Sequence, residues 1–178
     1  FVVGSLRYVA GIRGNCQWSG QHGVLVSPDH PSMAIGWLNP EPVISRDDLE
    51  RSPQERRAIV LHEVGHCRRL DPLLSWALEL LHCCFPFLWS WRWCSRAIRQ
   101  QMELAADRWA VQQGACPISL AKVLVAQQGA ATPHWGTASC GSPLFQRIEL
   151  LLGSAPERTP TVVGALFWGL LILGTRVL

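Results

Sequence analysis

The stretch RAIVLHEVGHCRRLDPLL, residues 57–74, places His62, Glu63 and His66 in the order H-E-x-x-H. Residues four apart lie on one face of a helix, so the two imidazoles can reach a single metal ion. Glu63 can then reach a water molecule on that ion without binding the ion itself. A shuffled chain of this composition would contain the pattern roughly one time in a hundred. The alternative is a pair of surface histidines and a glutamate on an amphipathic helix.

The residues before this motif carry the signals of a helix start. Ser52 is suited to cap a helix, Pro53 to occupy its first position, and Glu55 to complete a capping box. These signals predict a helix over 53–69, with the histidine pair in its C-terminal half.

A second pair of spaced side chains lies in QMELAADRWA, residues 101–110, where Glu103 and Asp107 are four apart. The pattern predicts a long helix over 87–113 that ends at Gly114. Catalytic zinc needs three protein ligands. Glu103 on a second helix can supply the third, and Asp107 can accept the hydrogen bond from the outer nitrogen of a ligating histidine. The alternative is a solvated helix face with salt bridges to Arg99 or Arg108.

The rest of the chain predicts an α+β fold that is mainly helical. Three short apolar stretches bounded by turn residues predict a small three-stranded sheet, at 22–27, 32–38 and 41–45. Two later stretches, 116–129 and 142–153, each carry a proline near the start and a glycine at the end, and predict two more helices.

The composition favours contact with a membrane. Hydrophobic residues make up 48% of the chain and charged residues only 16%, against about 25% charged in ordinary soluble domains. Residues 161–178 carry one charge and reach the minimum length of a transmembrane helix, although a buried core helix is the alternative. Residues 72–93 predict two membrane-associated helices that meet near Pro86, or else a soluble helical hairpin.

Charge and cysteine content exclude other classes of function. The net charge of +3 is too small to indicate nucleic-acid binding. The seven cysteines form no C-x-x-C pair, so they indicate neither a disulfide framework nor a cysteine zinc site.

These observations predict one catalytic domain with flanking segments. Residues 1–21 are expected to be a lead-in that follows an upstream membrane helix, and residues 22–153 the catalytic domain. Residues 154–160 are expected to be a linker before the transmembrane helix at 161–178.

The motifs EPVISRDDLERSPQERRAIVLHEVGHCRRLDPLL and ELAADRWAV together resemble the integral-membrane zinc peptidases of the BlaR/MecR type. They are also similar to the related HtpX-type endopeptidases, and the resemblance covers roughly residues 22–152. It implies a gluzincin helix pair in which the zinc ligands are His62, His66 and Glu103. It also implies that Glu63 is the general base and that Asp107 is the acid that supports a ligating histidine. It also implies a mixed sheet whose edge strand aligns the substrate, near Ile35–Leu38 or near Val43–Ser45.

The group that stabilises the oxyanion of the transition state is the least defined by the resemblance. The histidine that HtpX-type enzymes carry before their final arginine-containing helix has no clear counterpart, since Gly141 lies near that place. His134 and Arg147 are the candidates. No penicillin-binding sensor lies within these residues, so the sensing of beta-lactams is not implied.

The predicted function is that of a membrane-bound zinc metalloendopeptidase, with one Zn²⁺ per chain and a zinc-activated water, acting in proteolytic signalling. The expected partners are a protein or peptide substrate and the lipid bilayer, with no nucleic acid. The expected location is the bacterial plasma membrane, with the site facing the cytoplasm. One alternative is a non-proteolytic membrane signalling module with a structural or vestigial zinc site. Another is a membrane-interface domain without metal. The substrate, the activating signal and the oligomeric state are not predicted.

Overall fold

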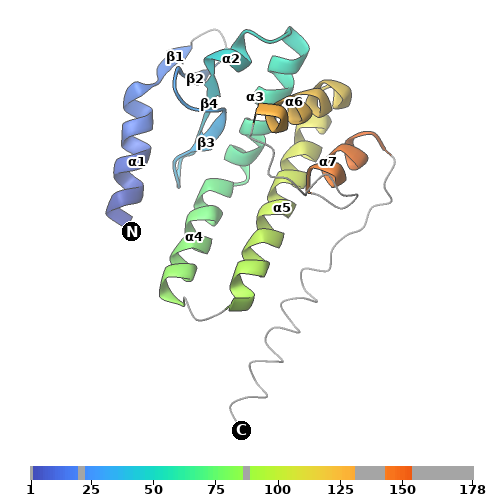
Figure 1. The fold of residues 1–178 in the computed structure, drawn as a ribbon. Coiled ribbons are helices and arrows are strands. Elements are labelled where there is room, and N and C mark those ends of the chain that lie inside the picture. Colours follow the sequence, from blue (N-terminus) through green and yellow to red (C-terminus); the bar gives the residue numbers. More distant parts are fainter. Residues whose placement is uncertain (1, 20–22, 86–88, 131–142, 154–178) are drawn as a thin grey trace.

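The computed structural model describes residues 2–19, 23–85, 89–130 and 143–153 (Figure 1). His134, the linker at 154–160 and the predicted transmembrane helix at 161–178 lie outside these residues. The helices are α1 Val2–Asn15, α2 Arg46–Leu49, α3 Pro53–Arg68, α4 Asp71–Cys84, α5 Trp89–Gln112, α6 Pro117–Ala130 and α7 Pro143–Leu151. The strands are β1 Gln17–Ser19, β2 Val24–Ser27, β3 Met33–Ile35 and β4 Glu41–Ser45.

The predicted α+β, mainly helical class is confirmed, and the described residues contain one strand, β1, and two helices, α1 and α2, that were not predicted. Helices α3, α5, α6 and α7 and strands β2, β3 and β4 all lie where the sequence placed them. The described part of the predicted lead-in, residues 1–21, contains α1 and β1.

The sheet is mixed, with the strand order β1-β2-β4-β3. Strand β4 pairs in parallel with β2 and antiparallel with β3. The alternative that placed the substrate-aligning edge at Val43–Ser45 is therefore wrong, because these residues belong to β4, which lies between β2 and β3 in the sheet. Strand β3 is an edge of the described sheet.

The two faces of the sheet are buried by different helices, because side chains alternate along a strand. On one face α1 packs Ile12 against Leu25, Ile35 and Val43. On the other face, Val24 and Ile44 pack against Ile59 of α3 and Val123 of α6. Figure 1 shows α1 and α3 on opposite sides of the sheet. Helix α3 is thereby fixed against the sheet and presents its remaining face to α5.

Small residues let α3 and α5 approach each other closely. Ala58 of α3 and Ala106 and Ala110 of α5 are fully buried. A Cβ atom at Gly65, inside the H-E-x-x-H motif, would lie only 3.2 Å from the Trp109 ring and 3.5 Å from Cα of Ala106. A larger residue at this position would press on the Trp109 ring, so the glycine suits the close packing of the two helices. This packing brings Glu103 of α5 beside the histidines of α3.

Helices α4 and α5 lie side by side (Figure 1). Helix α4 ends at Cys84 and α5 begins at Trp89, on either side of the break predicted at Pro86. Trp91 of α5 donates a hydrogen bond from its indole nitrogen to the carbonyl oxygen of Leu78 (3.3 Å). Large apolar side chains remain exposed on this pair, namely Leu74, Leu81, Phe85 and Trp93. Membrane association of residues 72–93 stays a prediction. Among the described residues, every helix is too short or too polar to cross a bilayer.

Candidate metal centre

Local sequence signals set the position of the histidine pair on α3. The Ser52 hydroxyl accepts a hydrogen bond from the backbone N–H of Glu55 (3.4 Å), which is the Ser52 half of the predicted capping box. The Glu55 carboxylate accepts a hydrogen bond from the same hydroxyl (2.8 Å). The helix then continues to Arg68 and buries His62 and Glu63, while His66 is half-buried.

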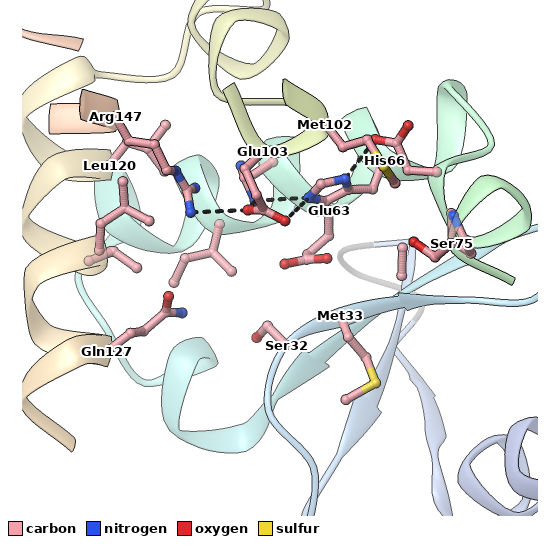
Figure 2. A pocket seen from close by; sticks show the side chains of 17 residues that line it. Ser32, Met33, Glu63, His66, Ser75, Met102, Glu103, Leu120, Gln127 and Arg147 are labelled. Atoms are coloured by element: carbon pink, nitrogen blue, oxygen red, sulfur yellow. Dashed lines mark hydrogen bonds and ion pairs between the residues drawn. The ribbon is translucent and has the colours of Figure 1, made fainter. Parts of the chain in front are cut away.

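Three side chains from two helices converge on one point. The Nε2 atoms of His62 and His66 lie 3.1 Å apart. The carboxylate oxygens of Glu103 lie 3.6 Å from Nε2 of His62 and 3.7 Å from Nε2 of His66. One ligand atom from each residue falls within 4.8 Å of the other two. These three residues were proposed from the sequence as a set, and the fold brings them together. Figure 2 shows two of them, His66 and Glu103, beside each other.

The outer nitrogen of each histidine faces a carboxylate. Nδ1 of His62 lies 2.9 Å from Oδ1 of Asp107, an ion-pair distance, although the direction is not aligned for a hydrogen bond. Nδ1 of His66 lies 2.8 Å from Oδ2 of Asp71. Because carboxylates take up both Nδ1 atoms, the Nε2 atoms are the ones left to bind a metal ion.

Asp71 is a site residue that the sequence analysis missed. Leu70 adopts a left-handed conformation (φ 56°) between α3 and α4, and Asp71 follows as the first residue of α4. This reversal turns the Asp71 carboxylate back toward His66, and Arg69 lies 3.4 Å from the same carboxylate. An Asp-Pro helix start only five residues after His66 is the signal that could have identified it.

Arg147 of α7 is placed by the two acids of α5. Its guanidinium contacts Asp107 through Nε (2.6 Å) and Nη2 (2.8 Å), and its Nη1 lies 3.0 Å from Glu103. The expected alternative partners of the acids do not take this role, because Arg99 pairs with Glu79 and Arg108 is exposed. Arg147 thus lies in the site, where it holds Glu103 and Asp107 in place.

The electrostatics of the site follow from burial and from these contacts. Burial lowers the pKa of His62, but the carboxylates of Asp107 and Glu103 outweigh burial and raise it to about 9. Burial raises the pKa of both acids, yet Arg147 and His62 together bring the pKa of Asp107 and of Glu103 below the usual range. The cluster therefore favours positive charge on its nitrogens and negative charge on its oxygens.

Glu63 differs from the other acids in the cluster. Burial raises the pKa of its carboxyl group, and the nearby histidines offset this only in part. Within the described residues no hydrogen bond holds its carboxylate. Figure 2 shows this carboxylate between the cluster and the strand that carries Ser32 and Met33. Glu63 is thus a buried acid at the edge of the cluster, and its carboxylate makes no hydrogen bond to a described residue.

A cavity of about 310 Å³ lies over the cluster. Its wall includes His62, Glu63, His66, Glu103 and Arg147, together with Ser32 to Ala34 at the start of β3. The donor set of two imidazoles and one carboxylate is one that binds catalytic zinc and leaves a position open. The side chains present therefore fit a metal ion, which His62, His66 and Glu103 would hold.

Comparison with known proteins agrees with these features. A family model described as BlaR1 peptidase M56 matches residues 25–151. Regulatory protein BlaR1 of Bacillus licheniformis is 28% identical over 78 residues, which cover 42% of this chain and 12% of that protein. No solved structure gave a significant match. Because the family model covers most of the chain, the protein belongs to the BlaR1 peptidase family M56.

Proposed function

We propose that this chain is a zinc-dependent endopeptidase that hydrolyses peptide bonds in protein substrates. The observation that carries the proposal is the convergence of His62, His66 and Glu103, whose ligand atoms lie within 4.8 Å of one another beside a cavity. Membership of a peptidase family supports the reaction class. The donor set supports zinc, since two histidines and a glutamate form a common catalytic zinc site.

A bound zinc ion would supply a Lewis acid that polarises a carbonyl group and makes water a stronger acid. The residues of this chain would do the rest. Glu63 would accept the proton of the attacking water on its carboxylate and deliver it to the leaving amine. Burial raises the pKa of this carboxyl group, which makes its carboxylate a stronger base.

The surrounding acids would keep the ligands in place. Asp107 and Asp71 would each fix one imidazole through its Nδ1 atom and so keep Nε2 turned to the metal. Arg147 would hold Glu103 and Asp107, which balances two negative charges in a buried position. His134 and Arg147 also stay candidates for stabilising the oxyanion.

Strand β3 would align the substrate. It is an edge of the described sheet and its first residues line the cavity beside Glu63. An extended peptide can add to such an edge by main-chain hydrogen bonds.

We assign the activity to proteolytic signalling at a membrane. The relative that matches is named a regulatory protein, and the apolar segment at 161–178 supports a membrane anchor. A site that faces the cytoplasm remains part of this proposal.

The test is the substitution Glu63→Gln in the full chain, assayed for hydrolysis of a casein substrate with zinc present. Loss of the base should lower the rate by about a thousandfold, because general base catalysis contributes roughly 10²–10⁴. Zinc content should stay unchanged, because Glu63 is not among the three convergent ligands. Glu55→Gln is the matched control, since glutamine also serves in the capping box at the start of the same helix.

Hydrolysis by Glu63→Gln at the rate of the unchanged protein would show that the base is wrongly assigned. A zinc-loaded protein that cleaves neither casein nor itself would favour a non-proteolytic module instead.

A further inference from the structure

A second and larger cavity, of about 720 Å³, continues from the metal centre along β3. It lies between α1, the end of β3 and α4, and the ion pair of Glu79 and Arg99 lies at its wall. Its other wall residues are mostly apolar, with Val9, Trp37 and Trp76 among them. We call this cavity the aromatic groove. None of the catalytic roles proposed above uses it.

The aromatic groove and the cavity over the metal centre form one continuous surface. Met33, Ala34, Pro72 and Ser75 line both of them. The first cavity begins at Ser32, and the second extends along the chain to Trp37. A chain that lies along β3 in the first cavity therefore enters the aromatic groove within a few residues, since a strand advances about 3.3 Å per residue.

The register of β3 directs backbone groups to its open edge. Ala34 lies opposite Pro42 of β4. Proline has no N–H, so this antiparallel pair is suited only to the position where the two residues exchange no hydrogen bonds. In that position the N–H and C=O of Ala34 point away from β4, toward the open edge. Ala34 lines both cavities, so its free backbone groups are placed where a substrate strand would pair.

The groove is shaped for an apolar side chain. The rings of Trp37 and Trp76 pack against each other with centroids 4.8 Å apart and planes tilted by 32°. They come from the loop after β3 and from α4, and both are half-buried. Two partly exposed tryptophans offer a large apolar surface, and covering it with a side chain removes that surface from water.

We propose that the aromatic groove is a substrate subsite that selects a large apolar or aromatic side chain, within three residues of the cleaved bond and on one side of it. The proposal rests on the proposed peptidase function, because it takes the cavity over His62 and His66 as the place of cleavage. The occupant is the extended substrate itself. Continuity of the two cavities and the free backbone groups of Ala34 favour a peptide strand as that occupant.

The experiment uses quenched-fluorescence decapeptides in which one position at a time is Phe, Leu, Ala or Asp. Mass spectrometry of the products locates each cleaved bond. For the full chain with zinc, kcat/KM should be about tenfold or more higher with Phe or Leu than with Asp, at one position on one side of the bond. Trp76→Ala and Val9→Trp, which remove or fill the apolar surface, should reduce that preference to less than about threefold.

Two matched controls keep this result specific. Leu74→Ala changes an exposed residue on the same helix as Trp76, and Ala10→Trp adds an indole beside Val9 on the exposed side of α1. Neither residue lines the aromatic groove, so both controls should keep the preference. Val9→Trp alters a half-buried helix position, so it also serves if Trp76→Ala fails to fold.

Binding of the same peptides, labelled with fluorescein, to the Glu63→Gln protein separates the two proposals. Tighter binding of the Phe and Leu peptides that is lost in Val9→Trp supports the subsite even if no peptide is cleaved. Cleavage without any apolar preference, or with a preference that both groove variants retain, overturns the subsite and leaves the peptidase proposal intact. Absence of both cleavage and selective binding overturns both.

Discussion

Two buried clusters of charged side chains lie near the sheet, and they differ in how their polar atoms are bonded. In the first, the Asp48 carboxylate accepts hydrogen bonds from the Ser32 hydroxyl (2.6 Å) and from Nε of Arg51 (2.7 Å). The backbone N–H of Asp48 is held in turn by the Ser45 hydroxyl, which caps α2. Burial raises the pKa of Asp48, but these contacts outweigh it and lower the pKa. This cluster has neighbours for each of its oxygens and fixes a turn.

The cluster around His62 and His66 has more charged groups and a different arrangement. Carboxylates hold the outer nitrogens, and the inner nitrogens face one another and Glu103. Beside them Glu63 keeps a carboxylate that no described residue binds by a hydrogen bond. The comparison shows that burial of charged groups alone does not indicate a metal site. A metal site is indicated when several potential ligand atoms converge on one point and other side chains fix the orientation of the ligating residues.

The largest expected effect that separates the two clusters is on zinc affinity. Asp71→Asn and Asp107→Asn should each lower it by about 10–100-fold, because each carboxylate orients a ligating histidine. Asp48→Asn should leave it unchanged. Competition with a zinc chelator dye measures the three dissociation constants. An Asp71→Asn protein that binds zinc as tightly as the unchanged protein would refute the role of Asp71.

The next effect is on the stability of the metal-free protein. Asp48→Asn should lower the free energy of unfolding by about 2 kcal/mol at pH 7, because it removes hydrogen bonds to a buried charged group. The folded-state pKa of Asp48 lies below its ordinary value of 3.8. The contribution of the Asp48 charge to the free energy of unfolding is therefore fully present above pH 3.8. It is lost as the pH falls through the lower pKa of the folded state.

Urea unfolding in the presence of a chelator, at pH 7 and in steps below pH 4, measures this difference. The unchanged protein and Asp48→Asn should converge as the solution is acidified. A gap that stays constant on acidification would mean that the charge of Asp48 does not stabilise the fold.

The smallest expected effect concerns the turn that places Asp71. Leu70→Gly removes the steric cost of the left-handed conformation at this position, which stabilises the folded state. It also raises the conformational entropy of the unfolded chain, which opposes folding. The two effects offset each other, so the free energy of unfolding should change by less than about 1 kcal/mol. Zinc affinity should stay within about twofold, because the Asp71 carboxylate still faces His66. A tenfold loss of affinity would show that the Leu70 side chain itself, not only the turn, positions Asp71.

Local signals made part of this fold predictable. Ser52 and Pro53 mark the start of α3, and Gly114, two residues after the end of α5, adopts the left-handed conformation (φ 89°). The pair His62 and Glu103 could be proposed because each belongs to a spaced motif on its own helix.

Other features depend on contacts distant in the sequence and gave no local signal. Helix α1 was not predicted, since Gly4, Gly11 and Gly14 weaken helix propensity and Ile12 is buried only once the sheet has formed. Arg147 is 40 residues away from Asp107, so the local sequence around either residue does not predict their contact. Asp71 reaches His66 only through the left-handed residue between α3 and α4.

The most direct test of the central claim is the zinc content of the purified full chain after dialysis, measured by mass spectrometry of the metal. We predict one zinc ion per chain in the unchanged protein and in Glu79→Gln, which removes an exposed acid paired with Arg99. In Glu103→Gln, which removes one of the three convergent ligands, we predict loss of stoichiometric zinc. One zinc ion retained per chain in Glu103→Gln, or none in the unchanged protein, would contradict the proposed metal centre.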